Sequence, residues 1–456
     1  METFDAIIIG SGQAGNPLLH DLAEAGWTVA MIEREHAGGT CINEGCTPTK
    51  TLIASSQAMH EIRRAKELGI NVGSIEIDFP KIIARKDEIV RSWSESGKRR
   101  TEQTKNATLV WGEASFVDAN TIRVEGRAGS ANRELRAKYI FINTGGRPAP
   151  AKFEGANEIG ILDSTSVMNL KSPEHLAIIG GGYVALEFGQ FFRRLGSRVT
   201  VLEMATEFLK HEDRDMADAI QNVLTEEGIE ILLDREVKSA NKNGNRIQLV
   251  TSGPAVTATH VLYAAGRVPN TEALHLERAG IATNERGYIA VNDRLETNVP
   301  NVFALGDVNG GPAFTHISYD DYRIVRDNVL HGANRTTQGR LVPYTMFIDP
   351  QFSRVGLSEA DAIKQNIPHR VAKMPMSHVA RASETGNKTG LLKAIVAPDD
   401  KILGAAIFGA EGGEILSMIE IAMCGGLTAH DLTEMIFVHP NYSEGLNTLF
   451  AEGLTA

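Results

Sequence analysis

The feature that most constrains the fold is a strand–glycine–helix–strand unit at the start of the chain. The apolar run 4–9 predicts a β-strand, the segment 17–25 predicts a helix, and the apolar run 27–32 predicts a second strand. The residues with special roles in this unit are Gly10, Gly12, Gly15 and Glu33. Such glycines allow a tight turn and bring backbone N–H groups close to a pyrophosphate, and the acid can accept a ribose hydroxyl. The unit therefore predicts a dinucleotide-binding domain.

The same unit recurs in the middle of the chain, where the apolar runs 176–179 and 198–202 flank a predicted helix. Its special residues are Gly180, Gly182, Ala185 and Glu203, and the spacing from first glycine to acid is the same in both copies. Either copy could be a glycine-rich loop without a ligand, an alternative that is more open for the second copy because Ala185 replaces a glycine. Two equal units predict an α/β fold with two Rossmann-like domains and an enzyme that passes electrons between two dinucleotides.

Glu203 bears on the choice of nicotinamide. A carboxylate at this strand end binds the free 2′-hydroxyl of NADH and repels the 2′-phosphate of NADPH, and no Arg or Lys stands between Met204 and Leu209. Ala185 points weakly the other way, because NADPH-using relatives of this fold often carry Ala there. NADH is therefore favoured, and NADPH remains possible.

The overall composition and charge of the chain limit which partners it can bind. A chain of 456 residues is expected to form two to four domains, and 42% hydrophobic with 23% charged residues indicates a folded protein. The net charge of −11 would repel nucleic acid and anionic membranes. No apolar run reaches the roughly 20 residues of a membrane span, and residues 1–5 lack the basic start of a signal peptide. We expect a cytoplasmic protein.

The sequence holds three cysteines, which is too few for a secreted disulfide framework. The closely spaced pair Cys41 and Cys46 indicates redox catalysis or metal binding, and no His or further Cys completes a zinc pattern. Redox chemistry is favoured and no metal site is expected. Cys424, which follows the apolar helical run 415–423, is expected to be a buried core residue.

The spacing of the pair restricts its backbone. On one regular helix Cys41 and Cys46 would lie about 7.5 Å apart, beyond the roughly 7 Å that a disulfide can bridge, so at least one lies outside the helix. Gly45 permits an irregular turn, and Pro48 suits the first turn of a helix that starts just after Cys46. The helix dipole and Lys50 would then stabilise a thiolate at Cys46.

The segment 38–55, GGTCINEGCTPTKTLIAS, closely resembles the redox-active motif of the class I pyridine nucleotide-disulfide oxidoreductases. This family includes dihydrolipoamide dehydrogenase, glutathione reductase and mercuric reductase. The resemblance implies FAD as a cofactor, exchange of Cys41 with the substrate and a charge-transfer contact of Cys46 with the flavin. It also implies that Lys50 neighbours flavin N5 and pairs with Glu187, and that Tyr183 gates the nicotinamide pocket.

Further segments resemble cofactor-binding motifs of the family: YIFINTGG at 139–146, AAGRVP at 264–269 and NVFALGD at 301–307. The first two are similar to the return strands of the FAD and NAD domains, and Asp307 matches the acid that binds the flavin ribityl chain. Together with the cysteine motif they imply these additional cofactor contacts: Gly39, Thr40, Thr144, Gly145, Gly266, Arg267, Gly306 and Asp307.

The segment FVHPNYSE at 437–444 pairs a histidine with an acid. Pro440 can open a helix that brings Glu444 back towards His439, and thiolate chemistry needs such a general acid/base oriented by a carboxylate. A lone histidine is more often structural. In the family a matching pair is supplied by the partner subunit, which implies a homodimer.

The resemblance implies a split FAD domain at 1–148 and 268–340, an NAD(P) domain at 149–267, and a C-terminal α+β dimerisation domain at 341–456. In this last domain 345–347 and 391–396 read as strands of an antiparallel sheet.

Departures from the family pattern bear on the substrate. The segment 314–327, FTHISYDDYRIVRD, differs from the LAH-type helix of dihydrolipoamide dehydrogenase. With CINEGCTPTKTL, VPYTMF and FSRVG it is very similar to the reactive-chlorine-resistance flavoproteins, which reduce hypothiocyanous acid. This similarity implies that the Cys41 thiolate attacks the oxidant, Cys46 resolves the adduct and His439 handles protons.

Three alternatives stay open: a dihydrolipoamide dehydrogenase, a mercuric or other metal-ion reductase, and a redox-sensing flavoprotein without turnover. Two substrates are disfavoured. The chain ends AEGLTA without the vicinal cysteines typical of mercuric reductases, and 16–26 lacks the arginine that glutathione reductases use.

Overall fold

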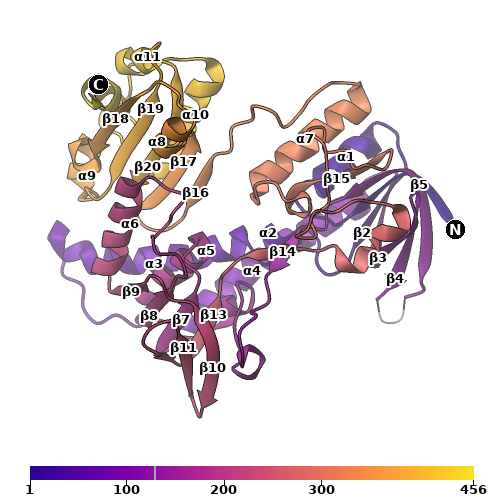
Figure 1. The fold of residues 1–456 in the computed structure, drawn as a ribbon, viewed down its shortest axis with the longest axis horizontal. Helices are drawn as coiled ribbons and strands as arrows, with labels where there is room; N and C mark the ends of the chain where they lie inside the picture. The colour runs from indigo at the N-terminus through magenta and orange to yellow at the C-terminus, as the bar shows by residue number, and fades with distance from the viewer. Residues whose placement is uncertain (128–129, 456) are drawn as a thin grey trace. The chain divides into compact units, whose positions relative to one another are not determined.

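The computed structural model describes residues 1–127 and 130–455, which divide into two compact units (Figure 1). Unit 1 comprises 1–51, 83–150 and 266–340, and unit 2 comprises 52–82, 151–265 and 341–456. The predicted three-domain boundaries stay a prediction. No helix in the described part of the chain is long and apolar enough to cross a membrane.

Unit 1 is built on a mixed sheet. Its strands are β1 (Glu2–Ile9), β2 (Val29–Glu33), β3 (Ala107–Asp118), β4 (Thr121–Gly126), β5 (Arg133–Ile142) and β15 (Val302–Ala304). The parallel part runs β3-β2-β1-β5-β15, and β4 pairs antiparallel with β3 and β5. Every residue of β2 is buried, as parallel strands covered on both faces require. The predicted strands 4–9 and 27–32 are confirmed.

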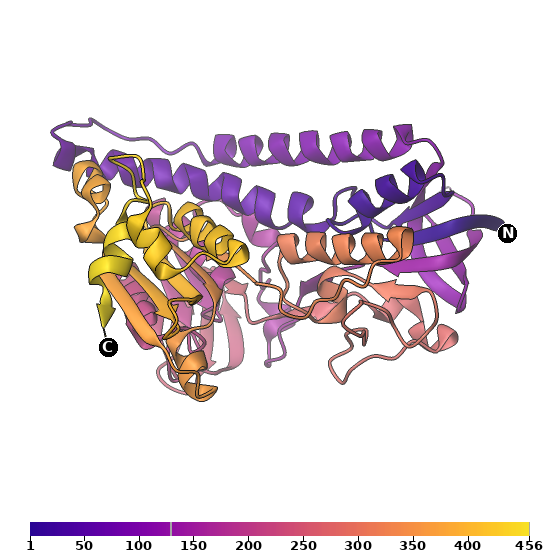
Figure 2. The same cartoon turned by 90° about the horizontal axis from the view of Figure 1, so that it is seen from above.

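Helices cover the unit 1 sheet. A buried cluster joins Leu18, Leu19 and Leu22 of α1 (Gly15–Glu24) to the strands and to Ile324 and Val325 of α7 (Thr315–His331). Two longer helices, seen in violet in Figure 2, are divided between the units: α3 (Cys46–Arg64) belongs to unit 1 only at 46–51, and α4 (Phe79–Gln103) belongs to it from 83 onward. The short strands β6 (Gly146–Pro148) and β14 (Arg267–Pro269) pair antiparallel. They lie next to the points at which the chain passes into unit 2 after 150 and returns to unit 1 at 266.

The first part of unit 2 repeats the parallel architecture. Strands run in the order β13 (His260–Tyr263), β7 (His175–Ile179), β8 (Arg198–Leu202) and β9 (Ile229–Leu232), all parallel. The helices α5 (Tyr183–Arg194) and α6 (Arg214–Glu226) accompany it, and β10 (Val237–Asn243), β11 (Arg246–Thr251) and β12 (Val256–Ala258) form an antiparallel sheet. The second predicted strand–helix–strand unit is therefore confirmed.

The C-terminal part of unit 2 is an antiparallel sheet in the order β16 (Tyr344–Met346), β17 (Gln351–Gly356), β20 (Ile402–Gly409), β19 (Leu391–Val396), β18 (Arg370–Pro375), β21 (Leu454–Thr455). Its helices are α8 (Glu359–Lys364), α9 (Ala380–Thr385), α10 (Gly412–Gly425), α11 (Ala429–Glu434) and α12 (Gly445–Glu452). The predicted strands at 345–347 and 391–396 are confirmed. Short 3-10 turns lie at Ala65–Leu68, Ala156–Glu158, Ser166–Asn169, Glu272–Leu274, Leu276–Ala279, Gly306–Asn309 and Met376–His378.

The prediction that Cys424 is a core residue is wrong, because its side chain is exposed. On α10 the buried residues Ile415, Ile419 and Ala422 follow one helical face. Cys424 lies two residues after Ala422, which turns it to the opposite face of the helix. An apolar run alone does not say which side of a helix meets the core.

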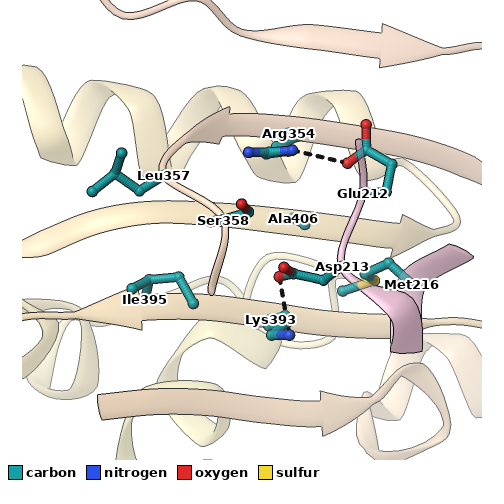
Figure 3. Close-up of a pocket in the computed structure, with 10 residues that line it drawn as sticks. Glu212, Asp213, Met216, Arg354, Leu357, Ser358, Lys393, Ile395 and Ala406 are labelled. Carbon is teal, nitrogen blue, oxygen red and sulfur yellow. Dashed lines mark hydrogen bonds and ion pairs between the residues drawn. The ribbon is translucent and has the colours of Figure 1, made fainter. Parts of the chain in front are cut away.

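A small polar pocket lies inside unit 2, between the segment before α6 and the C-terminal sheet (Figure 3). The Lys393 side chain, only 3% exposed, meets Asp213 at 3.0 Å, Asp215 at 3.1 Å and Glu359 at 2.6 Å. Arg354 pairs with Glu212 beside it at 3.1 Å. Burial alone would lower the pKa of Lys393, but its hydrogen bonds with Glu359 and Asp213 outweigh burial and raise that pKa. The pocket contains none of the predicted site residues. We call the ion pairs of Lys393 with Asp213, Asp215 and Glu359 the charged joint, because they connect the start of α6 to the C-terminal sheet.

We expect Lys393→Met to lower the free energy of unfolding by about 3 kcal/mol, because it leaves carboxylates buried without their cation. Thermal and denaturant unfolding of the purified protein would measure the change. Lys373→Met is the matched control, since Lys373 also contacts Asp215 but its side chain is 44% exposed. Equal effects of the two substitutions would contradict the interpretation.

Candidate active site

The first glycine loop is shaped by contacts between main chains. The Gly10 N–H donates to the carbonyl of Ile32 at 2.8 Å, and Gly10 has a φ of +101°. A Cβ at Gly10 would lie 2.3 Å from the carbonyl oxygen of Asn143, and one at Gly15 would lie 2.4 Å from the Gly10 carbonyl. Only glycine fits at these two positions.

The acid at the end of β2 closes this loop. Glu33, 8% exposed, accepts hydrogen bonds from the Ser11 N–H at 3.0 Å, the Ser11 hydroxyl at 2.6 Å and the Glu35 N–H at 2.8 Å. A carboxylate has further lone pairs, so it can still accept a ribose hydroxyl.

The second loop repeats this geometry. The Gly180 N–H donates to the Leu202 carbonyl at 2.8 Å with a φ of +103°, and Glu203 accepts from the Gly181 N–H at 2.6 Å and the Ala205 N–H at 2.8 Å. A Cβ at Gly182 would meet open space, and Ala185 is fully buried against the core. Both loops therefore lead directly into a helix start, the position at which an anion is favoured.

Sequence reasoning missed Asn143, which directly follows β5. Its side-chain oxygen accepts from the Gly15 N–H at 2.9 Å and the Gly12 N–H at 3.3 Å, in the amide orientation that satisfies both ends. Its place inside the YIFINTGG segment was the available signal.

The two return segments lie beside each other in unit 1. Thr144 Oγ1 donates to the Asn270 carbonyl at 2.8 Å, while Gly145 and Gly266 have positive φ with open space where a Cβ would stand. Arg267 donates to the Gly146 carbonyl, and its Nε lies 3.9 Å from Asp307.

Two acids follow β15: Asp307 is half-buried and Asp321 is buried. Burial raises the pKa of Asp307 against the opposing charge of Arg267. Gly306, with a φ of +72°, donates its N–H to Asp321 at 2.9 Å. Asp321 is 1% exposed and pairs with Arg340 at 2.6 Å. Sequence reasoning missed Asp321, which holds the loop that carries Asp307.

The cysteines lie on two helices with a break between them. Cys41 belongs to the short helix α2 (Gly39–Asn43), and Cys46 is the first residue of α3. A Cβ at Gly45 would lie 2.9 Å from the Thr40 carbonyl and 3.1 Å from the Cys41 Cα, so glycine is required at the break. The predicted turn at Gly45 and the helix start at Cys46 are confirmed.

The cysteine segment also packs on the first glycine loop. A Cβ at Gly39 would lie 2.7 Å from the Gly12 Cα, and Gly39 has a φ of +65°. The exposed Thr40 and half-buried Lys50 flank the pair, with Lys50 one turn after Cys46 on α3. This contact fixes the cysteines beside the predicted cofactor loop.

The two sulfurs differ in environment. Cys41 is half-buried, and Cys46 is exposed. The hydrogen bond with Cys46 raises the pKa of the Cys41 thiol, burial raises it further, and the Thr315 hydroxyl acts in the opposite direction. Cys46 Sγ lies 3.3 Å from Thr315 Oγ1. Sequence reasoning used the segment around Thr315 only to narrow the substrate and missed this contact.

Two predicted residues lie in unit 2 on α5. Glu187 is 3% exposed and accepts the Phe347 N–H at 2.9 Å, and Tyr183 begins the helix and is 42% exposed. The pairing of Glu187 with Lys50 stays a prediction.

His439 and Glu444 form the predicted pair: Nδ1 of His439 lies 2.8 Å from Glu444 Oε2. The His439 side chain is 72% exposed, and that of Glu444 is 18% exposed. The prediction that a helix opens at Pro440 is wrong, because α12 begins at Gly445 and the segment 440–444 is not helical. The Glu444 N–H donates to the Asn441 side chain at 2.8 Å, so a side-chain turn replaces the expected helix.

No group of three or more His, Cys, Asp or Glu side chains within 1–127 and 130–455 is placed to hold a metal ion.

Comparison with known proteins gives full-length matches. The model of the family "Pyridine nucleotide-disulphide oxidoreductase" matches 4–321, and that of its dimerisation domain matches 342–450. The chain is 40% identical to the probable pyridine nucleotide-disulfide oxidoreductase RclA of Escherichia coli (strain K12), covering 99% of each. It is 33% identical to a dihydrolipoyl dehydrogenase of Chlamydia muridarum (97% of this chain, 95% of that one). A mercuric reductase of Lysinibacillus sphaericus is 32% identical (98% and 82%).

Solved structures agree with these matches. The HOCl-induced flavoprotein disulfide reductase RclA from Escherichia coli has a TM-score of 0.91 and 39% identity, covering 98% of this chain and 99% of that one. A Cu(II) complex of the same protein has a TM-score of 0.92, again at 39% identity, and the match covers 99% of both chains. With its duplicated glycine loops, its α/β fold and its C-terminal dimerisation domain, this chain belongs to the pyridine nucleotide-disulphide oxidoreductases, a family of FAD-dependent enzymes that use a pyridine nucleotide.

Proposed function

We propose that the enzyme passes electrons from NADH through FAD to a Cys41–Cys46 disulfide and on to a small sulfur-based oxidant, with hypothiocyanous acid as the first candidate. The observation that carries this proposal is the helix break at Gly45. It places Cys46 at the N-terminus of the 19-residue helix α3 and Cys41 on a separate short helix. Two sulfurs so placed can form and open a disulfide without moving a regular helix.

The residues of unit 1 fit FAD. The Gly10–Gly15 turn leads into the start of α1, the Glu33 carboxylate stands at the end of β2, and Asp307 lies on a loop held by Asp321. FAD bound there supplies a carrier that accepts a hydride from the nicotinamide and delivers two electrons to the disulfide. The chain's own groups then determine where the protons and charges reside.

The two cysteines have different roles after the disulfide is reduced. Cys46 stands at the N-terminus of α3, where the helix dipole favours a thiolate, and contact with Cys46 raises the pKa of Cys41. We therefore assign the single negative charge of the reduced pair to Cys46 and the proton to Cys41. A base must remove that proton before Cys41 can attack. His439 of a partner subunit, oriented by Glu444, is our candidate base, and this makes a homodimer necessary for activity.

The chemistry with hypothiocyanous acid balances. The Cys41 thiolate attacks the sulfur of the oxidant, the S–O bond breaks, and the hydroxide released takes a proton from His439 to become water. The Cys46 thiolate then attacks the Cys41 sulfur and expels thiocyanate, which restores the disulfide. One NADH and one hypothiocyanous acid give NAD⁺, thiocyanate and water.

The relative named RclA, at 40% identity, supports an oxidant over lipoamide or mercuric ion, whose named enzymes are 33% and 32% identical. A stopped-flow screen of the reduced enzyme tests this choice. We expect hypothiocyanous acid to reoxidise it at least tenfold faster than lipoamide, glutathione disulfide or mercuric ion. An equally slow reaction with all four compounds would contradict the substrate assignment. A single turnover without sustained NADH consumption would favour a redox sensor.

The subunit-shared site can be tested by mixing two inactive variants. Cys41→Ser removes the attacking sulfur and His439→Ala removes the proton carrier, so each homodimer should lose nearly all turnover. Mixed dimers hold one site with both native residues, and steady-state assays of the refolded mixture should recover up to about a quarter of the native rate. Activity that stays at the level of the two variants would contradict a site built from both subunits.

Nicotinamide preference should depend on the charge of Glu203. Glu203→Gln keeps an acceptor for the Gly181 N–H but removes the negative charge that repels a 2′-phosphate. We expect the ratio of kcat/KM for NADH to that for NADPH to fall about tenfold, which corresponds to one charge interaction of ~1.4 kcal/mol. Glu207→Gln, an exposed glutamate in the same loop, is the control and should leave the ratio unchanged.

A further inference from the structure

The Thr315 hydroxyl lies within hydrogen-bonding distance of a reactive sulfur. Its Oγ1 is 3.3 Å from Cys46 Sγ, across 269 residues of sequence. Both residues belong to unit 1, so one compact body holds the contact. A hydroxyl can donate to a thiolate or accept from a thiol, but a negative sulfur leaves only the donor role.

The start of α7 fixes the position of this hydroxyl. Thr315 is the first residue of the helix, and Phe314 before it is extended, with its N–H bonded to the Pro312 carbonyl at 2.9 Å. The Ser318 N–H closes the first turn on the Phe314 carbonyl at 3.0 Å. The buried Asp321 ties the same helix to Gly306 at 2.9 Å. Thr315 is thus anchored by its helix and by the loop before it.

The hydroxyl acts on both sulfurs. Besides its 3.3 Å contact with Cys46, it opposes the rise in the pKa of Cys41.

We propose that the Thr315 hydroxyl donates a hydrogen bond to the reduced sulfur of Cys46 and stabilises the thiolate that forms when the disulfide opens. This inference rests on the proposed function, because it takes Cys46 as the thiolate of the reduced pair.

The proposal has a direct consequence for the redox equilibrium. Two electrons and one proton convert the disulfide into a Cys41 thiol and a Cys46 thiolate, and the electrons come from the nicotinamide. A disulfide sulfur is neutral and a weak acceptor, whereas a thiolate is a strong one. The hydrogen bond therefore favours the reduced form and makes the pair easier to reduce.

The test compares holoenzymes that differ in one hydroxyl. Thr315→Val keeps the shape of the side chain and removes the donor, and Thr315→Ser restores the donor without the methyl group. Thr51→Val is the matched control, because the Thr51 hydroxyl on α3 donates to the Thr47 carbonyl at 2.8 Å. Each protein is titrated anaerobically at one pH with mixtures of NADH and NAD⁺ while the long-wavelength thiolate–flavin absorbance is recorded.

We expect Thr315→Val to need a NADH to NAD⁺ ratio about tenfold or more above that of the native enzyme for half-maximal absorbance, the effect of one hydrogen bond to a charged group. Its absorbance band should also move to longer wavelength, because a thiolate without a donor gives up its electron more easily. Thr315→Ser and Thr51→Val should remain near the native ratio. If Thr315→Val does not retain flavin, Thr315→Ala gives the same comparison without a branched side chain at the helix start.

Two negative outcomes are distinguishable. A native enzyme that shows no long-wavelength absorbance on reduction would overturn the proposed role of Cys46, and with it this inference. A native enzyme that shows the band, with Thr315→Val and Thr315→Ala titrating at the native ratio and wavelength, would overturn the Thr315 hydrogen bond alone.

Discussion

The site depends on close contacts between main-chain segments. At these contacts only glycine fits, because a Cβ would collide with the neighbouring backbone. Gly10 lies against Asn143, Gly39 against Gly12, and Gly45 against Thr40. Through these approaches the first glycine loop, the short helix with Cys41 and the start of α3 pack against one another. A side chain at any of the three positions would force backbone apart and separate the sulfurs from the loop.

The charges of the site follow from this packing. Glu33 accepts the Ser11 N–H and Glu203 accepts the Gly181 N–H, so each carboxylate holds its glycine loop against the end of a strand. Burial raises the pKa of Asp307, and the buried Asp321 holds the loop that carries it through Gly306. Contact with Cys46 raises the pKa of the Cys41 thiol, the direction expected when two neighbouring thiols share one proton. Preorganised donors of this kind need no rearrangement when charge moves.

The charged joint around Lys393 has another purpose. It ties the start of α6 to the C-terminal sheet, because Asp213 before the helix and Asp215 in its first turn both pair with the buried Lys393 of β19. A buried ion cluster is costly to desolvate and adds little stability over apolar packing, but removing one member is expensive. The ion cluster fixes the position of α6 against the C-terminal sheet within unit 2.

Sequence alone determined the two glycine units, the buried parallel strands, the helix break at Gly45 and the pairing of His439 with Glu444, because these depend on local spacing and on backbone conformations open to few residues. Only the tertiary structure decided that Asn143 and Asp321 hold the loops and that Thr315 lies at Cys46, since each contact joins segments far apart in the chain. It also turned Cys424 outward and started α12 at Gly445 instead of Pro440. Periodicity predicts a helix, but which of its faces is buried, and which distant hydroxyl meets a sulfur, follows from packing in three dimensions.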